Sequence, residues 1–196
     1  MTSRARVAIL LVAGVCGCVR LEAQNTPATD KLFAAGGRIE MQLDGGNYNV
    51  LPAIGDHIRV TLSGNPGTAR VDVTAAGPRA TVAIRDTPHN NFQATIEVPK
   101  AADLVIRLSG GNLVVAAITG NKDIESVAGN TDIAVGDPND YASVDASVKA
   151  GDLDANVFPG AKASDTLGLF HRVSWSGRGK YTLRASVGAG NLTLRK

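Results

Sequence analysis

Cysteine is almost missing from this chain of 196 residues. The only two, Cys16 and Cys18, lie close to its start. The rest of the chain therefore cannot form a disulfide framework or a zinc–thiolate site. Its stability must come from apolar burial and backbone hydrogen bonds.

Aromatic residues and runs of basic residues are also scarce. Aromatics make up 4% of the chain, too few for a wide platform on which sugars could stack. The 20 basic and 18 acidic residues become 17 of each when residues 1–23 are set aside, and no basic block remains. Nucleic acids and anionic membranes both require a basic footprint, so neither is expected as the main partner.

Only one stretch is strongly apolar, and it is short. Val7–Val15 has nine residues and follows two arginines, whereas a membrane-spanning helix needs roughly 20. This pattern predicts a secretory signal peptide. A cut after Ala23 gives a signal peptide of residues 1–23, and a cut before Cys18 would leave that cysteine lipidated. Either cut predicts an exported protein (periplasmic, outer-membrane-associated or extracellular) with no transmembrane segment after cleavage.

No sustained helical stripe follows the leader. Residues 24–35 read as a polar tether. From residue 36 apolar and polar residues alternate, as in HIRVTLS, which places Ile58, Val60 and Leu62 on one face. Alternate side chains of a strand point to opposite faces, so the pattern predicts an all-β fold.

One short motif recurs along the chain. It reads LSGGNLVV at 108–115, VAGNTDI at 127–133, VKAGDL at 148–153 and VGAGNLTL at 187–194, with an early copy, LDGGNYNV, at 43–50. From Asn112 onward, successive copies are separated by 18, 22 and 39 residues. A period near 20 residues predicts a parallel β-solenoid, β-helix-like, over a single domain of residues 36–196. Its N-terminal β portion is expected to be less regular.

The polar residue of each copy is predicted to be a structural turn residue. Glycine and asparagine tolerate the backbone of sharp turns, and stacked asparagine amides can bond to one another. The residues concerned are Asn47, Asn112, Asn130, Asp152 and Asn191. Calcium-binding repeats have a second glycine and a period of about nine residues; this chain has neither, so no metal or cofactor is expected.

The order of these motifs resembles that of a known family. ATIEVPKAADLVIRLSGGNLVV, then ESVAGNTDIAV, then WSGRGKYTLRASVGAGNLTL are similar to the bacterial putative-adhesin β-solenoid domain, which occurs in exported proteins. The resemblance covers most of residues 36–196. It implies the same fold and an adhesion-type role, and it supplies no catalytic residues.

Carboxylate pairs are the alternative source of function. Enzymes that cleave polysaccharides use paired carboxylates, and the candidates here are Asp152 with Asp154, Asp123 with Glu125, and Asp137 with Asp140. They are interpreted as the polar outer face and turns of a β-protein. The three histidines, at positions 57, 89 and 171, have no metal-ligand spacing.

A last group of residues has two interpretations. Aromatic and basic residues gather near the end of the chain, namely Phe170, Arg172, Trp175, Arg178 and Tyr181. They either cap the open end of the stack or bind a ligand.

The sequence therefore predicts a non-enzymatic, exported scaffold or adhesion-type module at the bacterial cell envelope. Its partner would be an envelope protein or polysaccharide. A small polysaccharide-acting enzyme and an envelope-stress regulatory accessory are the alternatives.

Overall fold

The structure is a computed structural model and describes residues 26–166 and 170–196. The predicted signal peptide and Cys18 lie outside the described residues. Within these two ranges, no helix is long and apolar enough to cross a membrane. Helical structure there consists of one short 3-10 turn, η1 (Pro138–Asp140).

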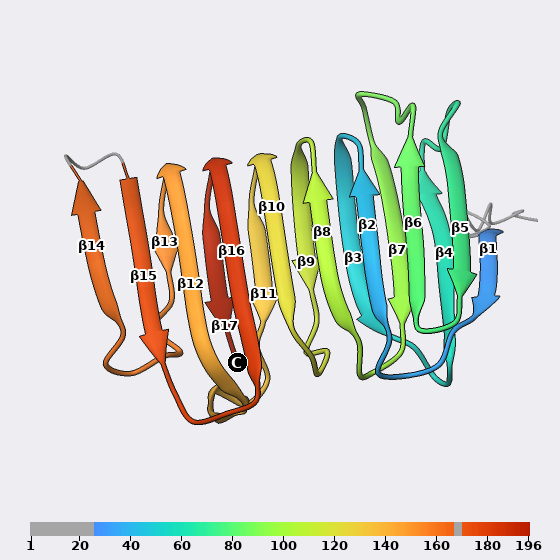
Figure 1. The fold of residues 1–196 in the computed structure, drawn as a ribbon. Helices are drawn as coiled ribbons and strands as arrows, with labels where there is room; N and C mark the ends of the chain where they lie inside the picture. Colours follow the sequence, from blue (N-terminus) through green and yellow to red (C-terminus); the bar gives the residue numbers. More distant parts are fainter. Residues whose placement is uncertain (1–25, 167–169) are drawn as a thin grey trace, which may run out of the picture.

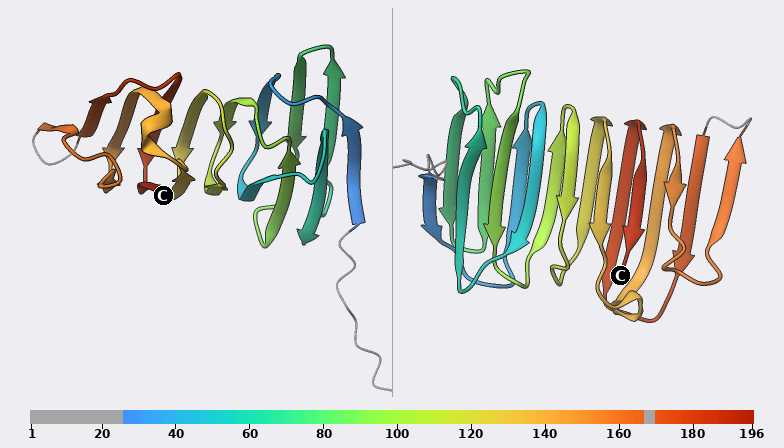
Figure 2. Two further views of the ribbon diagram at one scale, coloured as in Figure 1. Left: turned by 90° about the horizontal axis from the view of Figure 1, so that it is seen from below. Right: turned by 180° about the vertical axis from the view of Figure 1, so that it is seen from behind.

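The chain folds into two large β-sheets that face each other (Figures 1 and 2). The eight-stranded sheet has the order β1-β4-β7-β3-β9-β11-β17-β13, and the nine-stranded sheet has the order β14-β15-β12-β16-β10-β8-β2-β6-β5. The strands are β1 (Thr26–Leu32), β2 (Arg38–Leu43), β3 (Gly46–Pro52), β4 (His57–Gly64), β5 (Arg70–Ala76), β6 (Arg79–Arg85), β7 (Phe92–Val98), β8 (Asp103–Leu108), β9 (Gly111–Val115), β10 (Lys122–Ala128), β11 (Thr131–Ala134), β12 (Tyr141–Ala150), β13 (Leu153–Asp154), β14 (Lys162–Thr166), β15 (Phe170–Ser176), β16 (Tyr181–Ala189) and β17 (Leu192–Arg195).

Strand pairs are the repeating unit. In each pair the first strand lies in the nine-stranded sheet and the second in the eight-stranded sheet. The pairs stack in the order β6–β7, β2–β3, β8–β9, β10–β11, β16–β17, β12–β13. Neighbouring pairs are hydrogen-bonded in parallel. The C-terminal pair thus lies inside the stack, between two pairs that precede it in the sequence.

The all-β prediction is confirmed, but a parallel β-solenoid is not shown, because both sheets are mixed. At one end β1, β4 and β5 pair antiparallel, and at the other end β14 and β15 do the same. The strand pairs also do not stack in the order in which they occur in the sequence. Alternation of apolar and polar residues is the same in parallel and antiparallel strands, so the sequence pattern could not separate the two.

The core lies between the two sheets and is built from residues in register. Equivalent inward positions of the nine-stranded sheet are all buried: Met41, Ile106, Ile124, Ala185 and Ala146. Across from this row, the eight-stranded sheet contributes Val50, Val115, Ile133 and Leu194. Each strand pair therefore buries one apolar face against the other sheet, and that burial drives the fold.

Residues 26–32, assigned above to a polar tether, instead form β1. This strand pairs antiparallel with the edge of β4, and Arg59 Nη2 lies 2.9 Å from Asp30 Oδ2. Phe33, which follows, is only 3% exposed. The polar composition concealed the strand because an edge strand needs backbone partners more than apolar side chains.

Candidate functional site

Glycines stack at the turn between the two strands of each pair from β8–β9 to β12–β13. Gly111, Gly129, Gly190 and Gly151 have φ between +105° and +131°, a backbone conformation that suits glycine. A Cβ on any of them would lie 1.7–2.0 Å from the carbonyl oxygen of the glycine in the next pair. The recurring glycine is therefore required both by its φ angle and by the close contact.

The predicted turn residues lie beside these glycines in one continuous ladder. Asn112 Nδ2 donates to Asn47 Oδ1 at 2.8 Å, Asn130 Nδ2 to Asn112 Oδ1 at 3.1 Å, and Asn191 Nδ2 to Asn130 Oδ1 at 3.0 Å. The backbone N–H of Asp152 donates to Asn191 Oδ1 at 3.2 Å and ends the ladder. All five predicted turn residues are thus brought together.

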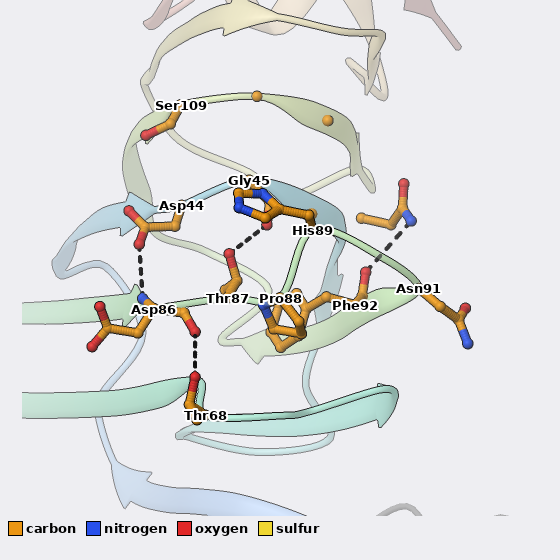
Figure 3. A pocket seen from close by; sticks show the side chains of 14 residues that line it. Asp44, Gly45, Thr68, Asp86, Thr87, Pro88, His89, Asn91, Phe92 and Ser109 are labelled. Carbon is orange, nitrogen blue, oxygen red and sulfur yellow. Dashed lines mark hydrogen bonds between the residues drawn. The ribbon is translucent and has the colours of Figure 1, made fainter.

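At its other end the ladder reaches a polar hollow. Asn47 Nδ2 donates to the Phe92 carbonyl at 3.4 Å. Beside it, a hollow of about 780 Å³ opens, which we call the corner hollow (Figure 3). Its floor is the backbone of the turns at Gly45–Gly46 and Gly110–Gly111, with Asp44 and Ser109. Its wall is the loop 86–91 between β6 and β7, which extends beyond the row of turns (Figure 1).

Hydrogen bonds fix this wall in place. The backbone N–H of Asp86 donates to Asp44 Oδ2 at 2.8 Å, and Thr87 Oγ1 donates to the Gly45 carbonyl at 2.6 Å (Figure 3). From the other side Thr68 Oγ1 donates to the Asp86 carbonyl at 3.3 Å. The corner hollow is therefore formed before any ligand arrives.

Both ends of the wall have an unusual backbone. Asp86 (φ 56°) and Asn91 (φ 53°) are the described non-glycine residues with positive φ. Asp and Asn adopt this left-handed conformation more readily than other non-glycine residues, so they let the chain turn at each end of the loop. The loop that they delimit and the turns that it faces make the corner hollow the candidate functional site.

Two buried phenols and a buried amine lie inside the molecule rather than in this hollow. Burial and the charge of Asp44 raise the pKa of Tyr48, whose hydroxyl donates to the Asp44 carbonyl at 2.9 Å. Lys122 is 2% exposed, and its Nζ donates to the Ile118 carbonyl at 2.6 Å and to Tyr141 Oη at 2.7 Å. Burial lowers the pKa of Lys122 to about 8 and raises that of Tyr141.

Four of the six candidate catalytic carboxylates have structural partners. Arg107 lies 3.2 Å from Asp123 Oδ1 and 3.3 Å from Glu125 Oε2. Asp137 Oδ1 accepts the Asn139 N–H at the start of η1, and Asp154 Oδ1 accepts the Asn156 N–H. Asp152 and Asp154 lie at the far end of the stack from the corner hollow.

The three histidines lie in different elements. His57 is in β4, His89 lines the corner hollow, and His171 Nδ1 in β15 is 3.3 Å from Asp165 Oδ2. Across residues 26–166 and 170–196, no group of three or more His, Cys, Asp or Glu is arranged to hold a metal ion.

The aromatic and basic group is divided between elements. Trp175 on β15 packs against Phe158, with ring centroids 5.1 Å apart, and its Nε1 donates to the Pro159 carbonyl at 3.2 Å. Tyr181 begins β16, inside the stack, and Arg178 lies in the preceding loop. Phe170 and Arg172 share β15 with Trp175, and Arg172 Nε donates to Asp145 Oδ1 at 3.0 Å. The geometry of Trp175 favours the cap interpretation for that residue.

The sequence analysis missed the wall of the corner hollow. Only His89 among its residues was considered, and only as a metal ligand. The signal was the segment DTPHNN, which interrupts the alternating pattern with turn-forming residues. In every other stacked pair a tight turn joins the two strands; here a longer loop does.

Comparisons with known proteins bear on the fold. A scan of protein-family models finds no match to this chain, and a search of curated proteins finds no significant relative. Among solved structures, the chain is similar to a "putative cell adhesion protein" from Clostridium sporogenes ATCC 15579. That similarity has a TM-score of 0.53 at 11% identity and covers 87% of this chain and 99% of that one. The two proteins share a fold.

A weaker similarity links the chain to a "putative adhesin" from Parabacteroides merdae ATCC 43184. It has a TM-score of 0.30 at 13% identity and covers 64% of this chain and 65% of that one.

Proposed function

We propose that this protein is a non-enzymatic, exported binding module of the adhesion type, and that the corner hollow binds its ligand. The observation that carries the proposal is the wall of residues 86–91, which hydrogen bonds hold on both sides. A site whose loop is already ordered loses little entropy when it binds. The shared fold with the Clostridium sporogenes protein supports the proposal.

The lining of the corner hollow indicates the kind of ligand. Carboxylates, hydroxyls, amides and open peptide groups line it, while its aromatic residue, Phe92, is 1% exposed. Such a surface offers hydrogen bonds to hydroxyl groups. We therefore propose a polysaccharide of the cell envelope as the ligand.

A glycan-binding screen with calorimetry tests this proposal. Ser109→Trp fills the floor of the hollow and should weaken binding at least tenfold, since about 1.4 kcal/mol is sufficient for that change. Lys149→Trp is the matched control, because Lys149 occupies the equivalent strand position in the β12–β13 pair at the far end of the stack. Equal binding by both variants, or no binding to any envelope polysaccharide, would contradict the proposal. Turnover of a bound polysaccharide would instead identify an enzyme.

Export is tested separately. Mass spectrometry of the mature N-terminus should show either a free Gln24 or a lipidated Cys18. A mature protein that retains residues 1–17 would contradict the signal peptide.

A further inference from the structure

The corner hollow does not end at the turns. A second hollow of about 390 Å³ lies on the outer face of the nine-stranded sheet and shares Asp44 and Ser109 with the first. The two hollows are therefore contiguous and pass around the corner of the molecule. The side chains that line only the second are Gln42, Leu43, Arg85, Arg107, Leu108, Glu125 and Val127.

Two arginines, Arg85 and Arg107, distinguish the second hollow from the first, although Asp44 and Glu125 also line it. Arg85 on β6 lies directly opposite Arg70 on β5, and both are exposed. Like charges directly opposite one another across a strand pair are destabilising. Arg70 Nε is 3.4 Å from Asp86 Oδ2, so its charge has a partner.

Arg85 lacks such a partner. Its Nη2 donates to Gln42 Oε1 at 3.4 Å, and in the part of the chain that the structure describes it forms no ion pair. The other arginine of this hollow, Arg107, is held by Asp123 and Glu125. Arg85 is thus an exposed arginine opposite a second arginine, with no counter-charge of its own among the described residues. A carboxylate or sulfate group of a ligand would supply the missing partner in a geometry that guanidinium matches.

We propose that the two hollows form one groove for an extended acidic polysaccharide, in which Arg85 binds an acidic group of the chain. This inference rests on the proposed function. Asp44 lines both hollows, but the residues that line the corner hollow include Asp86 and no arginine or lysine, so that hollow takes a neutral sugar. The groove therefore selects a chain in which acidic and neutral units alternate.

Binding of defined oligosaccharides tests the inference. The probes are a hyaluronan hexasaccharide, whose acidic groups are carboxylates, and a κ-carrageenan hexasaccharide, whose acidic groups are sulfates. Each is compared with its neutralised form, carboxyl-reduced or desulfated, and with its disaccharide. At least one acidic hexasaccharide should bind about tenfold more tightly than its neutral form and than its disaccharide, as expected for one charge-assisted contact and a two-part groove. Which of the two binds identifies the acidic group.

Two variants show whether Arg85 is responsible. Arg85→Gln should reduce binding of the acidic hexasaccharide about tenfold and leave its neutral form unchanged. Arg184→Gln, which removes an exposed arginine without an ion pair from the described part of the same sheet face, should change neither. The melting temperature of Arg85→Gln should stay the same or rise, because a like-charged pair is removed.

Several results would overturn the inference. Equal binding of acidic and neutral chains, equal losses in Arg85→Gln and Arg184→Gln, or a disaccharide that binds as tightly as the hexasaccharide would each do so. If neutral glycans bind at the corner hollow without any effect of Arg85, the proposed function stands and the inference fails. If none of the probes binds, the inference also fails, and the broader glycan screen decides the proposed function.

Discussion

The asparagine side chains at the turns form a ladder in which the amide groups point the same way. Each asparagine of the ladder donates to its neighbour in the same direction, from Asp152 toward Asn47. Aligned hydrogen bonds polarise one another, so the central members gain most. An asparagine in the middle of the ladder should therefore contribute more to the free energy of unfolding than an exposed asparagine elsewhere.

Asn130→Leu should lower the free energy of unfolding by about 1–2 kcal/mol, because it removes one donor and one acceptor of the ladder. Urea denaturation measures the loss. Asn156→Leu, at an exposed turn outside the ladder, is the control and should cost less than about 0.5 kcal/mol. Equal losses in the two variants would show that the ladder adds nothing.

The buried amine of Lys122 couples stability to pH. Folding lowers its pKa from 10.5 to about 8, chiefly by burial, while the charges of Asp103 and Asp140 act in the opposite direction. Between these two pH values the unfolded chain binds more protons than the folded protein. Stability must therefore rise with pH in this window.

From pH 8 to pH 10 the free energy of unfolding should rise by an amount on the order of 2 kcal/mol from this group. Lys122→Met, which has no titrating amine, should show a smaller rise. Urea denaturation at several pH values measures both slopes. If the two proteins have parallel profiles, Lys122 is charged throughout and its burial does not lower its pKa.

At the level of strands and turns, the close contact between neighbouring strand pairs decides which residue can occupy each stacked turn. Gly129→Ala places a Cβ 1.7 Å from the Gly111 carbonyl oxygen and should separate two strand pairs, with a loss above about 3 kcal/mol. Gly77→Ala is the matched control, since Gly77 also has positive φ (55°) but has no atom within 4 Å of the added Cβ. It should cost about 1 kcal/mol. Thermal and urea denaturation compare the two, and similar losses would mean that φ alone requires these glycines.

Strands and turns were also the features that the sequence predicted best. Alternation at Ile58, Val60 and Leu62 identified β4, and the repeated Gly-Asn identified the turns where the ladder forms. Pairing was not predictable, because alternation carries no information about which strand lies beside which. The corner hollow was missed for a related reason: its wall and floor are far apart in sequence and meet only when β6–β7 stacks on β2–β3.

For the whole molecule, position in the sequence does not match position in the stack. The β16–β17 pair ends the chain, yet it has a parallel neighbour on each side in both sheets. Leu192 is accordingly 0% exposed. Interior strands open only when the whole protein unfolds, whereas edge strands open locally.

Amide hydrogen exchange should therefore show β16 among the slowest segments, although it lies near the C-terminus. The edge strand β14, which has a single antiparallel partner, should exchange much faster. If β16 and β14 exchange at similar rates, the C-terminal pair does not lie inside the stack in solution.

Leu192→Ala should lower the free energy of unfolding by about 2–4 kcal/mol, as a core substitution does.

The insertion of β16–β17 has a consequence for biosynthesis. The ribosome makes β12–β13 first, but that pair cannot occupy its final place until the later strands have arrived to lie beneath it. Folding therefore cannot advance pair by pair beyond β10–β11, and the stack is completed only after translation has passed β17. In an exported protein, as we propose this one to be, the C-terminal strands would have to cross the membrane before the stack could be completed.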